Sequence, residues 1–137
     1  MLRFLSLLLA VALALGGCAS QSIYRGLGEQ AGIERLIDTF MPLLQADARV
    51  GNSLKDADIE HLKKMLTQQF CQLSGGPCKY SGKDMATIHD GLNITSPQFY
   101  ALVEDLQIAM DRNGIAQPVQ NRLLALLAPM HRDVVTK

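Results

Sequence analysis

Apolar residues recur every three or four positions along several stretches of the chain, which is the spacing of one face of an α-helix. The first stretch predicts a helix over residues 31–46 that contains Pro42. A proline inside a helix removes one backbone hydrogen bond, so either this helix bends there or two shorter helices meet. The second stretch predicts a helix over residues 59–73, capped by Asp56 or Asp58.

The second half of the chain predicts three more helices. A short one over residues 83–90 is stopped by Gly91. Thr95 and Pro97 open a long helix that ends at Asn113-Gly114, and Pro118 opens the last one. No segment alternates apolar and polar residues with a period of two, and no internal repeat is present. The pattern therefore predicts an all-α fold of about five helices.

The N-terminal residues have the composition of a secretion signal. Arg3 precedes an apolar run over residues 4–15. This run has about a dozen residues, whereas a membrane-spanning helix needs roughly 20. Its ending, Leu15-Gly16-Gly17-Cys18, resembles the lipobox of bacterial lipoproteins, which implies a signal peptide over residues 1–17 and a lipid on Cys18. An ordinary signal peptide with a cysteine near its end is the alternative.

This resemblance implies a lipid-anchored protein of the cell envelope. Ala19 after the cysteine resembles the lipoproteins sorted to an outer membrane, so in a Gram-negative cell we expect the periplasmic face of that membrane. The polar, glycine-rich residues 18–30 are then interpreted as a tether. About 120 residues remain after removal of the signal, which is enough for one domain and too few for two.

The charge balance argues against one class of function, and the cysteines suggest a disulfide. The chain has 13 basic and 13 acidic residues and no basic block, so the electrostatic footprint of a nucleic-acid-binding protein is missing. Cys71 and Cys78 flank a bend of glycines and a proline, and export would allow them to form a disulfide. Two free thiols are the alternative.

Motifs for enzymatic chemistry are mostly absent. The sequence has no Ser-His-Asp context, no phosphate-binding glycine loop before a helix and no pair of histidines spaced for zinc. His61 lies beside Glu60 and Lys63, and His131 lies near the C-terminus between Met130 and Arg132. Both histidines are predicted to be surface residues. His89 shares a short helix with Met85 and Ile88, so its ring is expected to face the interior. Spacing alone favours a core histidine whose ring nitrogens both have partners, and an iron ligand is the alternative.

Several segments stand in the order and spacing of the truncated haemoglobins, particularly their group I. They are Ser22-Ile23-Tyr24, Gly75-Gly76-Pro77, Tyr80, Gly82, Met85, His89-Asp90-Gly91, Ile94-Thr95 and Phe99. The resemblance extends from Ser22 to Pro129. It implies a two-over-two helical sandwich over residues 31–137 that binds haem b, with His89 as the proximal ligand of the iron. It also implies an apolar haem contact surface formed by Tyr80, Met85, Ile88, Ile94, Phe99, Leu102 and Leu106.

The other side of the expected haem departs from the family pattern. Group I members usually place a tyrosine where this chain has Met41, a phenylalanine where it has Leu54, and often a glutamine where it has Leu66. Leu62 occupies the gate position, and Phe70 completes this apolar set. None of these side chains donates a hydrogen bond, so we expect weaker retention of oxygen and a relative preference for carbon monoxide or nitric oxide.

Met65 matches a position from which some cyanobacterial relatives supply a sixth iron ligand. A thioether binds haem iron and raises its reduction potential, which suits electron transfer. Met41 is a second candidate for the same role. The alternative is that both methionines simply fill the core.

Three functions are therefore open. The first is a haem-binding envelope lipoprotein that binds a diatomic gas (O2, NO or CO) or passes electrons to a redox partner. The second is an enzyme that detoxifies nitric oxide, against which the apolar distal residues argue. The third is a degenerate globin fold without haem, which the loss of the clamping phenylalanine at Leu54 keeps open.

Overall fold

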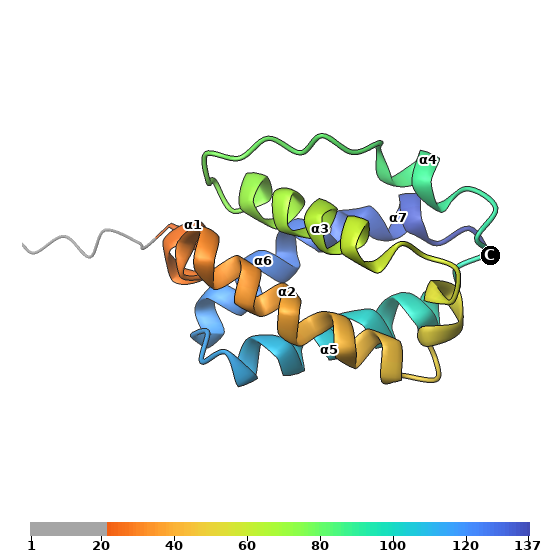
Figure 1. The fold of residues 1–137 in the computed structure, drawn as a ribbon, viewed down its shortest axis with the longest axis horizontal. Helices are drawn as coiled ribbons and strands as arrows, with labels where there is room; N and C mark the ends of the chain where they lie inside the picture. Colours follow the sequence, from red (N-terminus) through yellow and green to blue (C-terminus); the bar gives the residue numbers. More distant parts are fainter. Residues whose placement is uncertain (1–21) are drawn as a thin grey trace, which may run out of the picture.

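The computed structural model describes residues 22–137, which form helices and loops and contain no strand within that range (Figure 1). The prediction of an all-α fold is confirmed. The signal peptide and Cys18 lie outside the described residues. In chain order the elements are α1 (Ile23–Gly26), α2 (Glu29–Ala46), the 3-10 helix η1 (Gly51–Leu54), α3 (Ile59–Leu73), α4 (Met85–His89), α5 (Ser96–Arg112), α6 (Gln117–Leu127), the 3-10 helix η2 (Ala128–Met130) and α7 (His131–Val134).

Helix α2 is the centre of the core and packs on both α3 and α5. Its buried face carries the apolar residues that recur at helical spacing, among them Ile33, Leu36 and Phe40, each at most 1% exposed. The helix continues through Pro42 without a break, so the alternative of two shorter helices is wrong. Pro42 lies on the exposed face, where water can satisfy the carbonyl that loses its partner.

The helical domain begins earlier than the expected boundary at residue 31. Ser22 caps α1 through a side-chain hydrogen bond from the Arg25 amide, and the Tyr24 amide donates to the Ser74 carbonyl at 3.0 Å. Leu27 is only 2% exposed. Gly28 makes the turn into α2 at a φ of 85°, a conformation that glycine adopts without strain. Residues 23–30 thus belong to the packed domain and are not a tether.

Caps and prolines set the remaining helix ends. Asp58, and not Asp56, caps α3 by accepting from the His61 amide at 3.0 Å. Thr95 opens α5 with a reciprocal capping box. The expected last helix is divided into α6, η2 and α7, because Pro129 has no amide hydrogen to continue the α-helical ladder. The structure accordingly has more helical segments than the five expected.

The segment between α3 and α4 is tied back to α3. A disulfide joins Cys71 on α3 to Cys78, with their Cα atoms 5.7 Å apart. The Gln72 side chain accepts from the Tyr80 amide, and the Gln68 side chain accepts from the amide and hydroxyl of Ser81. These bonds place the segment that leads to His89.

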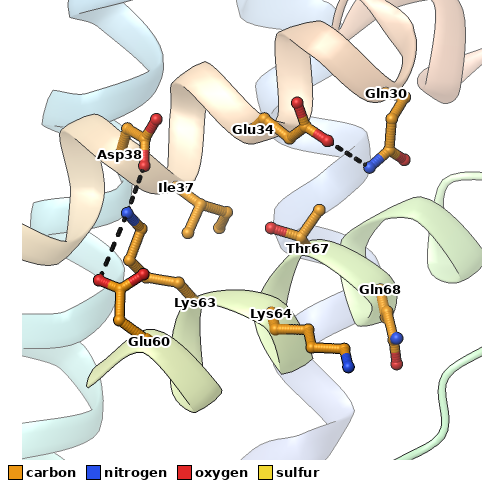
Figure 2. A pocket seen from close by; sticks show the side chains of 9 residues that line it. All are labelled: Gln30, Glu34, Ile37, Asp38, Glu60, Lys63, Lys64, Thr67 and Gln68. Carbon is orange, nitrogen blue, oxygen red and sulfur yellow. Dashed lines mark hydrogen bonds and ion pairs between the residues drawn. The ribbon is translucent and has the colours of Figure 1, made fainter. Parts of the chain in front are cut away.

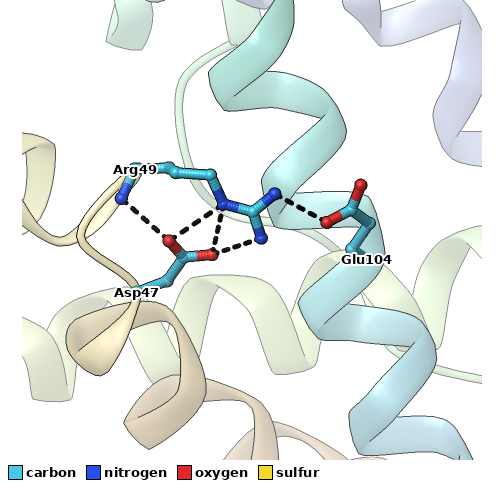
Figure 3. Close-up of polar contacts among 3 residues, drawn as sticks. All are labelled: Asp47, Arg49 and Glu104. Atoms are coloured by element: carbon cyan, nitrogen blue, oxygen red, sulfur yellow. Dashed lines mark hydrogen bonds and ion pairs between the residues drawn. The ribbon is translucent and has the colours of Figure 1, made fainter.

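Opposite charges join the loop after α2 to helix α5. Figure 3 shows Arg49 bridging Asp47 and Glu104, with a nitrogen–oxygen distance of 2.7 Å to each. The Arg49 guanidinium lowers the pKa of Asp47, and the two carboxylates raise the pKa of Arg49. Within the part of the chain that the structure describes, no helix is both long enough and apolar enough to cross a membrane.

Candidate functional site

A mainly apolar cavity of about 190 Å³ lies among α3, α4, α5 and the C-terminal helices. Most of the predicted haem-contact residues lie on its wall. These are Leu54, Leu62, Met65, Leu66, Phe70, Tyr80, Met85, Ile88, His89, Phe99 and Leu102. Helix α3 supplies one wall because residues 62, 65, 66, 69 and 70 fall on one face at helical spacing. The structure thus gathers side chains from between residue 40 and residue 134 into one site.

Three predicted contact residues do not line the cavity. Met41 and Leu106 are 2% and 0% exposed and belong to the core of α2 and α5. Ile94 is 9% exposed, and its carbonyl accepts from the amides of Thr136 and Lys137 at the end of the chain. Because Met41 is enclosed by other core residues, it is not placed to be an iron ligand in this structure.

Sequence patterns did not identify every residue of the wall. The additional ones are Phe40, Leu44, Val50, Gln69, Val103, Leu127, Met130 and Val134. The periodicity of apolar residues predicted that Phe40 and Leu44 are buried in a helix. It did not predict whether they pack against the core or line a cavity. Gln69 carried a weak signal, because it follows Met65 by four residues and therefore lies on the same face of α3.

His89 occupies the last position of α4 and is partly buried. Its Nδ1 lies 2.8 Å from the carbonyl oxygen of Met85. A carbonyl oxygen only accepts hydrogen bonds, so Nδ1 must carry the proton, and the neutral ring then keeps a lone pair on Nε2. No residue of the described chain forms a hydrogen bond with that nitrogen. The ring is therefore fixed in the tautomer that a metal-binding histidine requires.

Tyr80 is the second polar group of the cavity, and its hydroxyl is already committed. The hydroxyl donates to the carbonyl oxygen of Lys83 at 2.8 Å. Burial, and secondly the negative charge of Asp84, raise the pKa of Tyr80. Asp84 caps α4 by accepting from the amide and the hydroxyl of Thr87, and the hydroxyl bond is the main reason that the pKa of Asp84 is lowered. Tyr80 and Asp84 thus stabilise the start of the helix that carries His89.

The other two histidines lie elsewhere. His61 is exposed on α3, as predicted. His131 was also expected on the surface but is partly buried, because its ring packs edge-on against Phe99 with a centroid distance of 5.0 Å. Its Nε2 lies 3.0 Å from the Ser96 hydroxyl, and its ring stacks on Tyr100. These contacts give His131 a packing role beside the cavity.

The cavity residues fit a haem group. Haem needs an axial nitrogen ligand and apolar walls, and the structure offers His89 and a wall made almost entirely of aliphatic, aromatic and thioether side chains. The volume is below the range of about 300–1,000 Å³ that is usual for small-molecule pockets. Haem therefore requires the wall to move, and α4, η1 and α7, which line the cavity and bury none of their residues, are the elements best able to do so.

A second hollow lies on the outer surface between α2 and α3 and has a different character. Figure 2 shows this groove of about 430 Å³, which is lined mainly by polar and charged side chains. Lys63 lies 2.7 Å from Asp38 across the groove and 3.9 Å from Glu60 on its own helix. Although this groove is larger, it contains no histidine and no unpaired buried group, so the His89 cavity is the stronger candidate for a functional site.

Comparison with known proteins places this geometry in a family. A model of the bacterial-like globins matches residues 22–136. The chain is 30% identical over 117 residues to a group 1 truncated haemoglobin of Tetrahymena pyriformis, and the match covers 85% of this chain and 97% of that protein. It is 25% identical over 115 residues to a group 1 truncated haemoglobin of Mycolicibacterium paratuberculosis, covering 84% and 85% of the two chains.

Solved structures of truncated haemoglobins have the same fold as this chain. The crystal structure of the truncated haemoglobin from Tetrahymena pyriformis in its Fe(III) form superposes with a TM-score of 0.82 at 30% identity, over 85% of this chain and 100% of that one. A group II truncated haemoglobin from Bacillus anthracis reaches a TM-score of 0.76 at 23% identity, over 85% and 92% of the two chains, and at that identity shows the fold alone.

Proposed function

The chain belongs to the bacterial-like globin family, and on that premise we propose that it binds one haem b in the cavity beside His89 and holds a diatomic gas at the iron. The observation that carries this proposal is the His89 ring, whose Nδ1 is bonded to the Met85 carbonyl while Nε2 has no partner in the described chain. When bound, haem supplies an iron centre for a small neutral ligand.

The protein's own residues hold and shield the group. His89 would hold the iron through Nε2, and the hydrogen bond from its Nδ1 to the Met85 carbonyl keeps the ring from rotating. Leu62, Leu66 and Phe70 form an apolar wall on α3 that excludes water. A dry, apolar wall suits neutral diatomic molecules better than charged substrates.

Electron transfer is the second candidate, and one observation favours it. Met65 lines the cavity from α3, whereas Met41 does not. A thioether at the sixth position of the iron would raise the reduction potential and compete with gas ligands. A six-coordinate spectrum of the ferrous protein without added gas would support this role, and a five-coordinate spectrum would exclude it.

The experiment that tests haem binding is titration of the purified protein with haem, followed by the Soret absorption. We expect saturation at about one haem per chain, as the single axial histidine implies. His89→Ala should lose the axial ligand and release the haem, and added imidazole should partly restore the wild-type spectrum. His61→Ala is the matched control, because that histidine is exposed on α3. An unchanged spectrum in His89→Ala would contradict the proposal.

We further propose that the protein is anchored in the cell envelope through a lipid on Cys18. The lipobox-like ending at Cys18 supports this location, and so does the Cys71–Cys78 disulfide, since such bonds persist mainly in oxidising compartments outside the cytoplasm. Cys18→Ser should move the protein from the membrane fraction to the soluble fraction. Retention in the membrane fraction would argue against the lipid anchor.

A further inference from the structure

Two methionine sulfur atoms meet at one point on the wall of the cavity beside His89. Of the six methionines in the chain, Met65, Met85 and Met130 line this cavity. The Sδ atoms of Met85 and Met130 lie 3.4 and 3.6 Å from the same atom, Nε2 of Gln69. The two sulfur atoms are therefore at most about 7 Å apart, the sum of these distances, although one belongs to α4 and the other to η2.

The amide group between the two sulfur atoms is held there only weakly. A thioether is a weak acceptor of hydrogen bonds, so the Gln69 side chain gains little from either contact. Met85 and Met130 are both half-buried, which shields the pair without sealing it from solvent. A cation that takes the place of the amide nitrogen therefore displaces two weak hydrogen bonds and gains two sulfur ligands.

His89 brings a nitrogen atom to the same wall. Met85 begins α4 and His89 ends it four positions later, so the two side chains project from one face of the helix. The Nδ1 atom of the ring donates to the Met85 carbonyl, and Nε2 has no partner in the described chain. Helix α7, which continues from η2, packs on α4 and keeps Met130 next to Met85. Two thioethers and one neutral imidazole nitrogen thus line one part of the cavity.

The character of these donor atoms selects the kind of metal ion. Thioether sulfur is a soft ligand that prefers Cu(I), and imidazole also binds copper, whereas Ca²⁺ and Mg²⁺ need oxygen ligands. All three donors are neutral, which suits a singly charged ion better than a divalent one. Zn²⁺ needs several histidine, cysteine or carboxylate ligands, and residues 22–137 contain no group of three such side chains that could hold a metal ion.

We propose that the haem-free protein binds one Cu(I) ion in this cavity, through Met85 Sδ, Met130 Sδ and His89 Nε2. The inference does not depend on haem binding, but the two occupants exclude each other because both use His89. The cavity of about 190 Å³ is large enough for a single ion without the movement of the wall that haem requires. Rotation about the flexible bonds of the methionine side chains brings both sulfur atoms onto the ion.

The test is an anaerobic titration of the haem-free protein with Cu(I), in competition with a chromogenic Cu(I) chelator. We expect one Cu(I) per chain. The double variant Met85→Leu, Met130→Leu replaces both sulfur atoms and nearly conserves the side-chain volume. It should bind Cu(I) at least about a hundredfold more weakly, because the loss of even an outer-shell partner costs about 10–100-fold in metal affinity.

Met41→Leu is the matched control, because it makes the same change at a sulfur atom that is enclosed in the core, in a residue 2% exposed. It should bind Cu(I) as the wild type does. X-ray absorption of the wild-type copper complex is a second measurement that needs no variant, and it should show two sulfur neighbours and one nitrogen neighbour. A double variant that keeps the wild-type affinity, or a copper complex without sulfur neighbours, would overturn this inference.

The haem titration separates this inference from the proposed function. The double variant keeps His89, so it should still develop the Soret band. A wild-type chain that takes up haem but no Cu(I) would overturn the inference and leave the proposed function intact. A wild-type chain that binds Cu(I) but takes up no haem would overturn the proposed function alone.

Discussion

Asp105 on α5 carries the one buried side-chain oxygen that has no hydrogen-bond partner in the described chain, Oδ2. The side chain is 6% exposed and lies against the carboxyl group of Asp47. Burial, and secondly the negative charge of Asp47, raise the pKa of Asp105, although Arg49 opposes the shift and Glu104 adds to it. Figure 3 shows Arg49, which opposes this shift, held by Asp47 and Glu104.

A carboxyl group whose pKa is raised by folding stabilises the folded state at low pH, and this contribution is lost as the pH rises through the raised value. In Asp105→Asn the side chain is uncharged at every pH, and its amide can donate a hydrogen bond to the carboxylate of Asp47. We therefore expect it to increase the free energy of unfolding by roughly 1 kcal/mol at pH 7, and much less at about pH 4. Urea unfolding at both pH values measures this.

The control for this variant is Asp56→Asn on the exposed loop before α3, which should change stability little at either pH. Arg49 lowers the pKa of Asp47, so Asp47 stabilises the folded state at pH values above the pKa that it has in the unfolded chain. This pKa should stay lowered in Asp105→Asn. A gain in Asp105→Asn as large at about pH 4 as at pH 7 would contradict the assignment of a buried charge.

Individual site residues differ in how far the sequence could predict them. His89 was identifiable only because it matches a family motif, since its spacing on the short helix fits an ordinary core histidine. Gln69 carried only a weak signal, its spacing from Met65, because a glutamine on a helix is ordinarily a surface residue, whereas in the structure it is 8% exposed. Met41 was misplaced because helical periodicity indicates burial but does not separate a core face from a cavity wall.

Among the elements, the connection from α3 to α4 decides where His89 lies. The Cys71–Cys78 disulfide closes a short loop in this connection, and the side chains of Gln68 and Gln72 hold the residues that follow. The disulfide restricts the unfolded chain, whereas the hydrogen bonds hold the folded loop. Both act on the segment that leads to α4.

Removing the disulfide should therefore lower stability without abolishing the fold. We expect the double variant Cys71→Ser, Cys78→Ser to lose about 2–3 kcal/mol of unfolding free energy, as loop-closure entropy predicts for so short a loop. Denaturant unfolding measures the loss, and wild-type protein treated with a reductant is the control that should fall to the same value. Equal stability of the oxidised and reduced wild type would show that the disulfide does not stabilise the fold.

Helix boundaries followed the sequence wherever a local signal decides them. Asp58 and Thr95 cap α3 and α5, and Gly114 follows the end of α5 at a φ of 65°. The exceptions arose from tertiary packing. The glycine-rich stretch before residue 31 folds because Leu27 is buried, and Pro42 stays within α2 because packing on α3 and α5 outweighs the lost hydrogen bond.

At the scale of the whole molecule, the all-α class followed from periodicity. The arrangement of helices came from the family resemblance, since periodicity alone does not say which apolar faces meet. In Figure 1, α3 lies above α5, α2 crosses α5 obliquely, and the C-terminal helices run behind α3 toward α4. The cavity depends on this arrangement, because its wall draws on α3, α4, α5 and α7 together.

Haem binding at His89 is the central claim, and the Soret absorption of the purified chain during titration with haem tests it most directly. We predict a Soret band that saturates at about one haem per chain. The His89→Ala variant should lose this band, and the His61→Ala variant should keep it. A wild-type chain that develops no Soret band beyond that of free haem would contradict it.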